Sequence, residues 1–423
     1  MRALIAGGGF AVLAATLTLA ISRAPLGTPV FLAAAGVMSA VYVAVLRRVL
    51  APDPPPTRGL VLALLFAVAF RVPLALAPVD GRSDMIRYLY DGRVQRLGLN
   101  PYAIVPSTPS LAWTHTAVTR TMTSVHDRTP YPAAAQWFFR AVVTVHESRL
   151  AMKLALLACD LLTILVLLRW LAACGRSPWL AVAYAWNPLV ILEIAHSGHI
   201  DALGVLWIAV AAWMLSTRRT LLASAALVIA IATKLLPIVL LPLFWRRVRV
   251  RDALAGGAVL AALYLPFSSA GVLPLAGVSS LIDRARFNGP VFRTLAALAG
   301  PRAAVAAAIL AGLAAAAWMR RRRAAEDPAA WAWPMAIALA GAPVIYPWYL
   351  LYCTPFLFTL ETLPIAVWTI GIIPTYLVWH LPDYRRLWAV PPAALALEYG
   401  AVLAAVVWMW RRLRAGSRKE SLR

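Results

Sequence analysis

Long apolar runs separated by short polar turns extend from one end of the chain to the other. Turn residues and charges divide it into roughly 14 apolar segments of the length that a bilayer requires, some too short to span alone. The first three run from about Ala3 to Ala20, from Pro29 to Val45 and from Leu60 to Leu76. After a long polar region, further segments are centred near Ile164, Ala183, Leu206, Leu227, Val239, Leu260, Ala308, Ile337, Leu351, Gly371 and Leu403. The pattern predicts an all-α polytopic membrane protein.

One apolar segment, from Leu222 to Trp245, is interrupted in its middle by Thr233-Lys234-Leu-Leu-Pro237. A proline breaks helical hydrogen bonding, so the pattern predicts two short helices that form a hairpin with Lys234 at its tip. Ionisable groups at membrane depth are candidates for function, and a lysine point charge suits a phosphate. A lysine that extends its charged end to the membrane surface explains the residue equally well.

The longest polar region, about Val79 to Arg149, contains the densest group of carboxylates in the chain. A helix that begins at Asp84 would place Asp84, Arg87, Tyr88 and Asp91 on one face. A nearby guanidinium favours ionised carboxylates, so Asp84 is a candidate proton acceptor. The same spacing is typical of an amphipathic helix at the membrane surface with salt bridges along its wet face, and both interpretations stay open at this point.

Later parts of this region predict a turn and a second helix. Gly98-Leu-Asn100-Pro101-Tyr102 is a signal that ends a helix. The run from Tyr131 through Gln136 to Phe139 predicts a second interfacial helix. Membrane anchoring is the commoner role for most of its aromatic rings.

A third polar group, Glu193-Ile-Ala-His196-Ser-Gly-His199-Ile-Asp201, follows an apolar segment. Two histidines three residues apart can bind a metal together with Asp201. Two histidines and a carboxylate are common in proteins, however, and a polar helix cap that lines a cavity is the favoured interpretation.

Two weaker signals are Arg284-Ala-Arg286-Phe-Asn288 and Tyr346-Pro-Trp348-Tyr349. Trp and Tyr at a membrane surface need no function.

Composition agrees with a membrane protein. The chain is 62% hydrophobic and 13% charged, and its formal net charge is +23. Such a charge suggests nucleic acid in a soluble protein, but here much of the arginine lies in short clusters between apolar runs, as the positive-inside rule expects. The clusters are Arg47 and Arg48, Arg218 and Arg219, Arg246 to Arg251, Arg320 to Arg323, and Arg411 to Lys419. Their alternation predicts that both termini are cytoplasmic.

The loops predicted to lie outside also carry many arginines: Arg82, Arg87, Arg93, Arg96, Arg284, Arg286 and Arg293. This excess departs from the positive-inside rule and is explained by an anion bound at the outer face.

The three cysteines have no spacing typical of a metal site or a disulfide framework. The apolar run after Met1 lacks a clear small-residue cleavage site, so we interpret it as a retained first helix.

Several motifs occur together in the order found in the GT-C superfamily of membrane glycosyltransferases. Asp84-x-x-Arg87-Tyr88-x-x-Asp91-Gly92, then Gly98-x-Asn100-Pro101-Tyr102, then Tyr131-Pro132 with Gln136, resemble the first outer loop of that superfamily. Gly198-His199-x-Asp201, Thr233-Lys234-x-x-Pro237 and Pro347-Trp348-Tyr349 resemble its bacterial mannosyltransferases that use polyprenol-phosphate-mannose. Two apolar segments precede the one usually found before the catalytic loop, and Ala133 stands where a second proline is frequent.

The resemblance implies a GT-C-like bundle of roughly 11 to 14 transmembrane segments with interfacial helices in the first large outer loop. It implies two extra N-terminal helices in residues 1–50, a catalytic module in 51–350 with outer loop 79–149, and C-terminal helices with a basic tail in 351–423. The protein would be a multi-pass protein of the inner cell membrane with its active site on the extracytoplasmic side.

The implied reaction moves a hexose, best taken as mannose, from a polyprenyl-phosphate donor to a glycolipid or glycan acceptor with inversion. Asp84 would be the general base, and Asp91 would hold Arg87, contact the acceptor or bind a divalent metal if one is needed. The candidates for binding the donor phosphate are Arg87, Arg93, Lys234, Arg284 and Arg286. The candidates for lining the substrate cavity are Tyr88, Asn100, Tyr131, His199, Asp201, Asn288, Trp348 and Tyr349.

The main alternative is a transporter or flippase for a lipid-linked or anionic substrate, which shares a broken helix and a charge at membrane depth. Transporters often contain internal repeats, and none is evident here. No P-loop or dinucleotide-binding fingerprint stands out, which agrees with a lipid-linked donor and no nucleotide.

Overall fold

The computed structural model describes residues 1–51, 59–78, 83–270 and 284–420. Within these ranges the chain is helical, and the only β pairing is an isolated bridge between Phe287 and Val344. The Pro-rich stretch 52–56, Arg82 and residues 271–283 lie outside the described residues. The all-α polytopic architecture is therefore confirmed.

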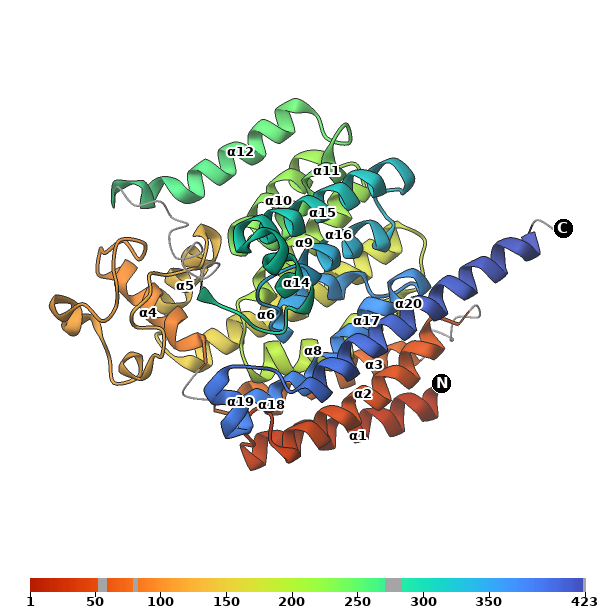
Figure 1. Ribbon diagram of the computed structural model, residues 1–423, viewed down its shortest axis with the longest axis horizontal. Helices are drawn as coiled ribbons and strands as arrows, with labels where there is room; N and C mark the ends of the chain where they lie inside the picture. The colour runs from red at the N-terminus through yellow and green to blue at the C-terminus, as the bar shows by residue number, and fades with distance from the viewer. Residues whose placement is uncertain (52–58, 79–82, 271–283, 421–423) are drawn as a thin grey trace.

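The helices form one bundle with a smaller group of elements at one end (Figure 1). The N-terminal half contains α1 (Arg2–Ser22), α2 (Pro29–Val49), α3 (Leu60–Leu76), α4 (Met85–Arg96), α5 (Ala133–Val145), α6 (Arg149–Ala173), α7 (Val182–Ala185), α8 (Pro188–Val190), the π-helical η5 (Ile191–His196), α9 (Asp201–Ser216) and α10 (Thr220–Thr233). The C-terminal half contains η6 (Leu236–Leu240), α11 (Leu241–Phe244), α12 (Val250–Tyr264), α14 (Pro290–Ala299), α15 (Pro301–Arg322), α16 (Pro328–Ala340), η8 (Pro347–Phe356), α17 (Leu363–Gly371), η10 (Ile373–Tyr376), α18 (Leu377–His380), α19 (Pro382–Leu387) and α20 (Pro392–Glu420).

Seven helices of the described chain are long and apolar enough to cross a bilayer, and a bent pair raises this to eight. The spans are Arg2–Ser22, Pro29–Val49, Arg149–Ala173, Val250–Ser268, Pro301–Arg322, Leu360–His380 and Pro392–Arg414, and the pair is Pro178–Ala185 with Pro188–His196, bent by 53°. Other apolar segments form helices of 10–17 residues. The described chain thus has fewer helices able to span a bilayer than the predicted 11 to 14 segments, because prolines break several apolar runs into short helices.

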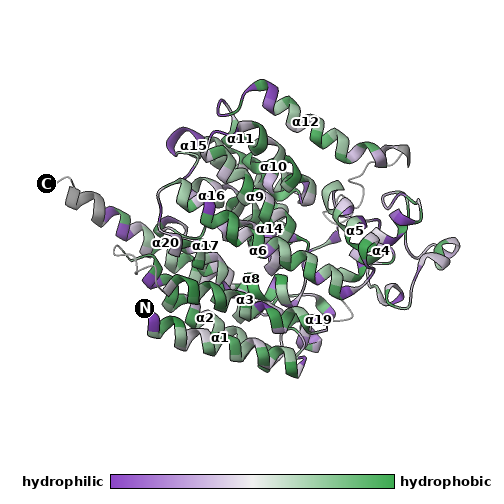
Figure 2. Ribbon diagram, turned by 180° about the vertical axis from the view of Figure 1, so that it is seen from behind, coloured by the Kyte–Doolittle hydropathy of each residue, from purple (hydrophilic) through white to green (hydrophobic). Residues whose placement is uncertain are grey.

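The distribution of hydrophobic and hydrophilic residues agrees with this arrangement of helices. Hydrophobic residues cover the long helices, while hydrophilic residues are more frequent around α4 and in the turns (Figure 2). The two termini lie on the same side of the molecule, opposite to α4 and α5 (Figure 1). The end of the bundle that carries α4 and α5 is therefore distinct from the end that carries the termini.

A buried ion pair accounts for Asp160, a carboxylate that lies within the apolar helix α6. The guanidinium of Arg71 on α3 donates to both carboxylate oxygens of Asp160 on α6, and the Tyr184 hydroxyl donates to Asp160 Oδ1 at 2.7 Å. Both charged side chains are completely buried. Lys153 instead donates to the carbonyls of Leu74 and Ala77 at the end of α3. Removing one partner of such a pair leaves a buried charge, so the pair fixes α3 against α6.

Candidate active site

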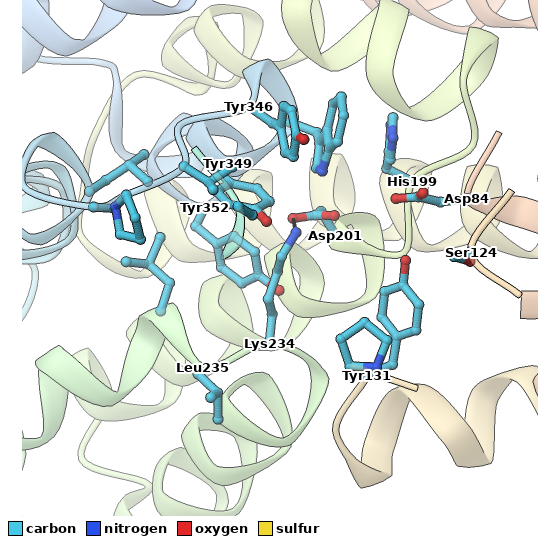
Figure 3. A pocket seen from close by; sticks show the side chains of 18 of the residues that line it. Asp84, Ser124, Tyr131, His199, Asp201, Lys234, Leu235, Tyr346, Tyr349 and Tyr352 are labelled. Carbon is cyan, nitrogen blue, oxygen red and sulfur yellow. Dashed lines mark hydrogen bonds and ion pairs between the residues drawn. The ribbon is translucent and has the colours of Figure 1, made fainter. Parts of the chain in front are cut away.

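A cavity of about 1010 Å³ lies where α4, the start of α9, the break after α10 and the start of η8 meet. Its polar part contains Asp84, Tyr131, His199, Asp201 and Lys234, whose side chains point toward a common space (Figure 3). These residues are spread over 150 positions of the sequence, from Asp84 to Lys234, so the cavity depends on the tertiary packing of the bundle. It is the natural candidate for a substrate site.

Asp84 precedes the first residue of α4 and is exposed to the cavity. Its side chain caps no backbone N–H of the helix. No residue within the described ranges forms an ion pair or hydrogen bond with its carboxylate. Asp84 therefore offers a carboxylate that is free to accept a proton from a bound molecule.

Arg87 and Asp91 form a buried pair one turn apart on α4, with 2.7 Å between Arg87 Nε and Asp91 Oδ1. Arg87 Nη1 donates to the carbonyls of Ser124 and Asp127, at 3.0 and 2.9 Å. Nη2 of Arg87 is buried and has no hydrogen-bond partner among the described residues. Because Arg87 lines the cavity, this nitrogen is available to a bound anion.

Asp91 is completely buried and does not line the cavity. Its second oxygen, Oδ2, accepts hydrogen bonds from Thr129 Oγ1 at 2.5 Å and from Gln136 Nε2 at 3.0 Å. The carboxylate thus ties α4 to the segment before α5 and to α5 itself. This geometry favours the expectation that Asp91 holds Arg87 over a role in contact with substrate.

The close packing of α4 on α5 depends on Gly92. A Cβ at this position would lie 2.6 Å from the carbonyl oxygen of Phe139 and 2.7 Å from a methyl group of Val143. Phe139 in turn stacks on Tyr88, with 4.5 Å between ring centroids and 7° between the planes. The absent side chain therefore lets α5 press Tyr88 into the cavity wall.

The break predicted at Lys234 is confirmed. α10 ends at Thr233, and Lys234 has extended backbone angles, with φ −158° and ψ 142°. Its ammonium lies 2.6 Å from Asp201 Oδ1 at the start of α9 and 4.0 Å from the centre of the Tyr349 ring. Asp201 Oδ2 is buried and has no hydrogen-bond partner among the described residues. The ammonium has three donors, so contact with Asp201 leaves donors for a ligand.

His199 lies between Glu193 and Trp348. Its Nδ1 is 2.8 Å from Glu193 Oε2, and its ring stacks on Trp348 with centroids 4.2 Å apart. Burial lowers the pKa of His199, but the hydrogen bond to Glu193 and the charges of Glu193, Asp84 and Asp201 together raise it above its ordinary value. The protonated imidazole is therefore favoured beside the cavity.

The phenols of Tyr88 and Tyr131 form another wall of the cavity. Their rings meet edge to face at 5.1 Å, and the N–H of Ile200 donates to the Tyr88 hydroxyl at 3.3 Å. Burial, and next the charge of Asp84, raise the pKa of both phenols well above the ordinary value. Both groups are thus neutral at physiological pH and act as polar but uncharged surface.

The cavity continues into an apolar branch between η6, α15 and α16. Its lining residues are aliphatic: Leu235, Leu236, Ile238, Val239, Val305, Ala308, Ile309, Ala338 and Leu339. Ile238 on η6 and Ile309 on α15 are exposed at its edge. A single cavity thus combines a charged part near Asp84 with an apolar branch whose lining includes the exposed side chains of Ile238 and Ile309.

Some of the predicted site residues do not line the cavity. Arg93 contacts Glu147 at 3.0 Å and the carbonyl of Thr114 at 2.7 Å. Asn100 donates to the carbonyl of Phe267, and Arg286 lies over the Phe292 ring. Asn288 has a positive φ of 53° and donates to Glu398. These residues organise loops around the site and do not reach into it.

Other predicted residues do line the cavity: Asp84, Arg87, Tyr88, Tyr131, His199, Asp201, Lys234, Arg284, Trp348 and Tyr349. Arg284 also forms an exposed ion pair with Asp127 at 2.7 Å. Lining residues that the sequence did not single out include Arg128, Tyr352, Trp379, Arg385 and Trp388. The excess of arginine in outer loops was the only signal for Arg128 and Arg385.

Charge in the cavity favours an anionic ligand. Five cationic side chains line it, namely Arg87, Arg128, Lys234, Arg284 and Arg385. Three carboxylates line it as well, namely Asp84, Asp127 and Asp201. In the part of the chain that the structure describes, no group of three or more His, Cys, Asp or Glu residues is arranged to hold a metal ion.

Comparison with known proteins identifies the family. Residues 8–248 match the family described as alpha-(1->6)-mannopyranosyltransferase, N-terminal domain, which is more than half of the chain. The match begins within α1 and ends after α11, so it includes Asp84, His199, Asp201 and Lys234. No curated protein matches the chain. The helical bundle and its cavity thus belong to a mannosyl-transferring membrane glycosyltransferase, and the chain is a member of the alpha-(1->6)-mannopyranosyltransferase family.

Proposed function

We propose that this protein transfers mannose from a polyprenyl-phosphate donor to a hydroxyl group of a glycan or glycolipid acceptor, with inversion at the anomeric carbon. The observation that carries the proposal is the cavity itself. It joins a carboxylate that has no partner among the described residues, an excess of cationic side chains and an apolar branch. An α-(1→6) linkage in the product is proposed from the description of the family.

Asp84 is the proposed general base. It takes the proton of the acceptor hydroxyl while the acceptor oxygen forms a bond to the sugar C1. The bond between C1 and the phosphate oxygen breaks, and the polyprenyl phosphate leaves with the bonding electrons. A single carboxylate without a covalent partner suits one displacement step, and positioned general bases typically contribute about 10²- to 10⁴-fold to a rate.

Lys234 and Arg87 are the proposed ligands of the donor phosphate. Both residues line the cavity: the Lys234 side chain is partly exposed, and the buried Nη2 of Arg87 has no described partner. Arg284 at the cavity rim adds a third positive charge. Fixed cations stabilise the negative charge that develops on the leaving phosphate, and they do so most strongly where water is excluded.

The apolar branch between η6, α15 and α16 is the proposed site of the first isoprenoid units. Its aliphatic lining matches a hydrocarbon chain, and its exposed edge at Ile238 and Ile309 leads into lipid. The stacked rings of Trp348 and Tyr346 suit the apolar face of a sugar. The donor would therefore cross from the bilayer into the cavity with its phosphate at the junction of the two parts.

We further propose that the cavity opens to the extracytoplasmic side of the inner membrane and that both termini are cytoplasmic. The termini lie on the side opposite to α4 and α5 (Figure 1). The arginine clusters at positions 218–219 and 246–251 flank the hairpin at the end opposite to Lys234. This arrangement follows the positive-inside rule.

Replacement of Asp84 by Asn tests the proposal. Membranes that contain the variant are incubated with radiolabelled polyprenyl-phosphate mannose and extracted glycolipids, and label in new glycosidic linkages is measured. We expect transfer to fall by about 10²-fold or more while the protein accumulates normally, because the amide cannot accept the proton.

The matched control is Asp383→Asn, which removes an exposed carboxylate on α19 that does not line the cavity. This control should keep wild-type transfer. Wild-type transfer by the Asp84→Asn variant would refute the assignment of the base. Movement of label across the membrane without a new linkage would favour a flippase.

A further inference from the structure

A second cavity lies at the end of the hairpin opposite to Lys234. It has a volume of about 410 Å³, and it is formed where the turn between α9 and α10 meets the start of α12. Four arginines line it: Arg218, Arg219, Arg249 and Arg251. The proposed transfer reaction uses none of them.

The positive charge of this cavity is largely uncompensated. The only carboxylate in its lining is Asp252, whose Oδ2 accepts a hydrogen bond from Thr220 Oγ1 at 2.5 Å. Arg251 Nε lies 3.6 Å from Asp252 Oδ1 in an exposed contact. No other carboxylate of the described residues pairs with Arg218, Arg219 or Arg249. Three guanidinium groups thus face the cavity and lack an anion.

The backbone adds to this charge. α10 begins at Thr220 and α12 begins at Val250, and both first turns border the cavity. Neither helix has a side-chain cap at its N-terminus, because the preceding residues are Arg219 and Arg249. The free N–H groups and positive dipole ends of both helices are therefore directed at the space that the arginines line.

Apolar surface next to the cavity indicates the kind of anion. Leu221 and Leu222 line the cavity and are about half exposed, at 51% each. Leu254, one turn into the proposed membrane span of α12, is 69% exposed. A small free anion would leave these side chains in water, whereas the acyl chains of a lipid would cover them.

We propose that this cavity binds the phosphate of an anionic phospholipid, with the headgroup among Arg218, Arg219 and Arg249 and the acyl chains along Leu221, Leu222 and Leu254. The site lies at the opposite end of α10 from the catalytic cavity and is independent of the proposed reaction. Guanidinium groups suit it because they form paired hydrogen bonds with phosphate oxygens.

The test compares two pairs of arginines. The variant Arg219→Gln/Arg249→Gln removes two charges from the cavity, and the control Arg321→Gln/Arg322→Gln removes two exposed charges at the end of α15 that border neither cavity. Each full-length protein is purified in an uncharged detergent and mixed with equal amounts of phosphatidylglycerol and phosphatidylcholine. Retained lipid is then measured by native mass spectrometry, after gel filtration has shown that the protein is monodisperse.

We expect the wild-type protein and the control to retain phosphatidylglycerol in preference to phosphatidylcholine. The cavity variant should bind phosphatidylglycerol about 25-fold more weakly, since each basic residue at a membrane surface contributes about fivefold. Equal loss in the control would overturn the proposal, because it would indicate a general effect of surface charge. Displacement of phosphatidylglycerol by millimolar inorganic phosphate would overturn the lipid assignment and indicate a site for a free anion.

Discussion

Two carboxylates, Asp84 just before α4 and Asp91 within it, show how differently similar residues are used in this molecule. Asp84 and Asp91 are seven positions apart, which is about 10 Å along a helix. Asp84 is exposed to the cavity and has no ion pair or hydrogen bond with any described residue. Asp91 is completely buried, and its two oxygens accept hydrogen bonds from Arg87, Thr129 and Gln136. The two aspartates share one helix face, but the side chains around them differ.

The difference separates reaction chemistry from the support that positions it. A carboxylate without partners can accept a proton from a bound molecule, whereas the oxygens of Asp91 are already occupied by three donors. Asp91 fixes the guanidinium of Arg87 in a buried position from which Nη2 remains available to the cavity. Under the proposed function, the exposed carboxylate next to α4 takes part in bond formation, and the buried carboxylate in the middle of the helix orients a cation.

Replacement of Asp91 by Asn should have a large effect on stability. The change leaves the Arg87 charge buried without its partner, and breaking such a pair typically costs about 3–5 kcal/mol. We expect lower accumulation in membranes and a clearly lower midpoint of thermal unfolding in detergent. Asp84→Asn is the matched comparison, and it should unfold at the wild-type temperature because its carboxylate has no described partner.

The opposite outcome is informative. If Asp91→Asn unfolds like the wild-type protein but transfers mannose 10²-fold more slowly, then Asp91 takes part in the reaction and the division between the two carboxylates fails. A double variant that also replaces Arg87 with Met tests the stability argument, because removing both charges should recover part of the stability that Asp91→Asn loses.

The sequence predicted the local features of the site well. The helix after Asp84, the helix after Pro132 and the break at Lys234 all follow from short patterns and occur as expected. The sequence also identified ten of the polar and aromatic residues that line the cavity. Such features depend on neighbours in the chain, so their signals survive without knowledge of the fold.

The partners of charged residues depend on tertiary contacts and were not predictable. No local pattern indicates that Arg71 pairs with Asp160 across 89 positions, or that Arg93 pairs with Glu147 and does not line the cavity. Arg385 was missed for the same reason, since it lies on a short helix near the C-terminus. An arginine in a polar loop has the same pattern whether it faces a ligand, a carbonyl or water.

Replacement of Lys234 by Gln extends the comparison to the cation side of the cavity. The ammonium is shared between Asp201 and the proposed phosphate. Loss of a charge-assisted hydrogen bond of about 1.5–3 kcal/mol predicts a decrease in kcat/KM of roughly 10- to 100-fold. Lys234→Arg keeps the charge and is the matched control, which should retain more activity than Lys234→Gln. Kinetics at varied donor concentration check the effect, and wild-type kcat/KM in Lys234→Gln would exclude this lysine from the phosphate site.

The smallest expected effect concerns Glu193, which touches the site only through His199. The Glu193 carboxylate raises the pKa of His199 against the lowering effect of burial, so it favours an imidazolium beside the anion site. A group whose pKa is raised by folding stabilises the protein below its unfolded pKa and loses that contribution as pH rises through the folded pKa. If the imidazolium assists donor binding, transfer should decline over the same rise in pH.

Glu193→Gln removes the interaction that raises the pKa of His199, so the alkaline limb of the pH–rate profile should move to lower pH. Glu147→Gln, which alters the ion pair with Arg93 away from the cavity, should leave that limb unchanged. An unshifted limb in Glu193→Gln would mean that His199 contributes its stacked ring to the cavity wall and not its charge.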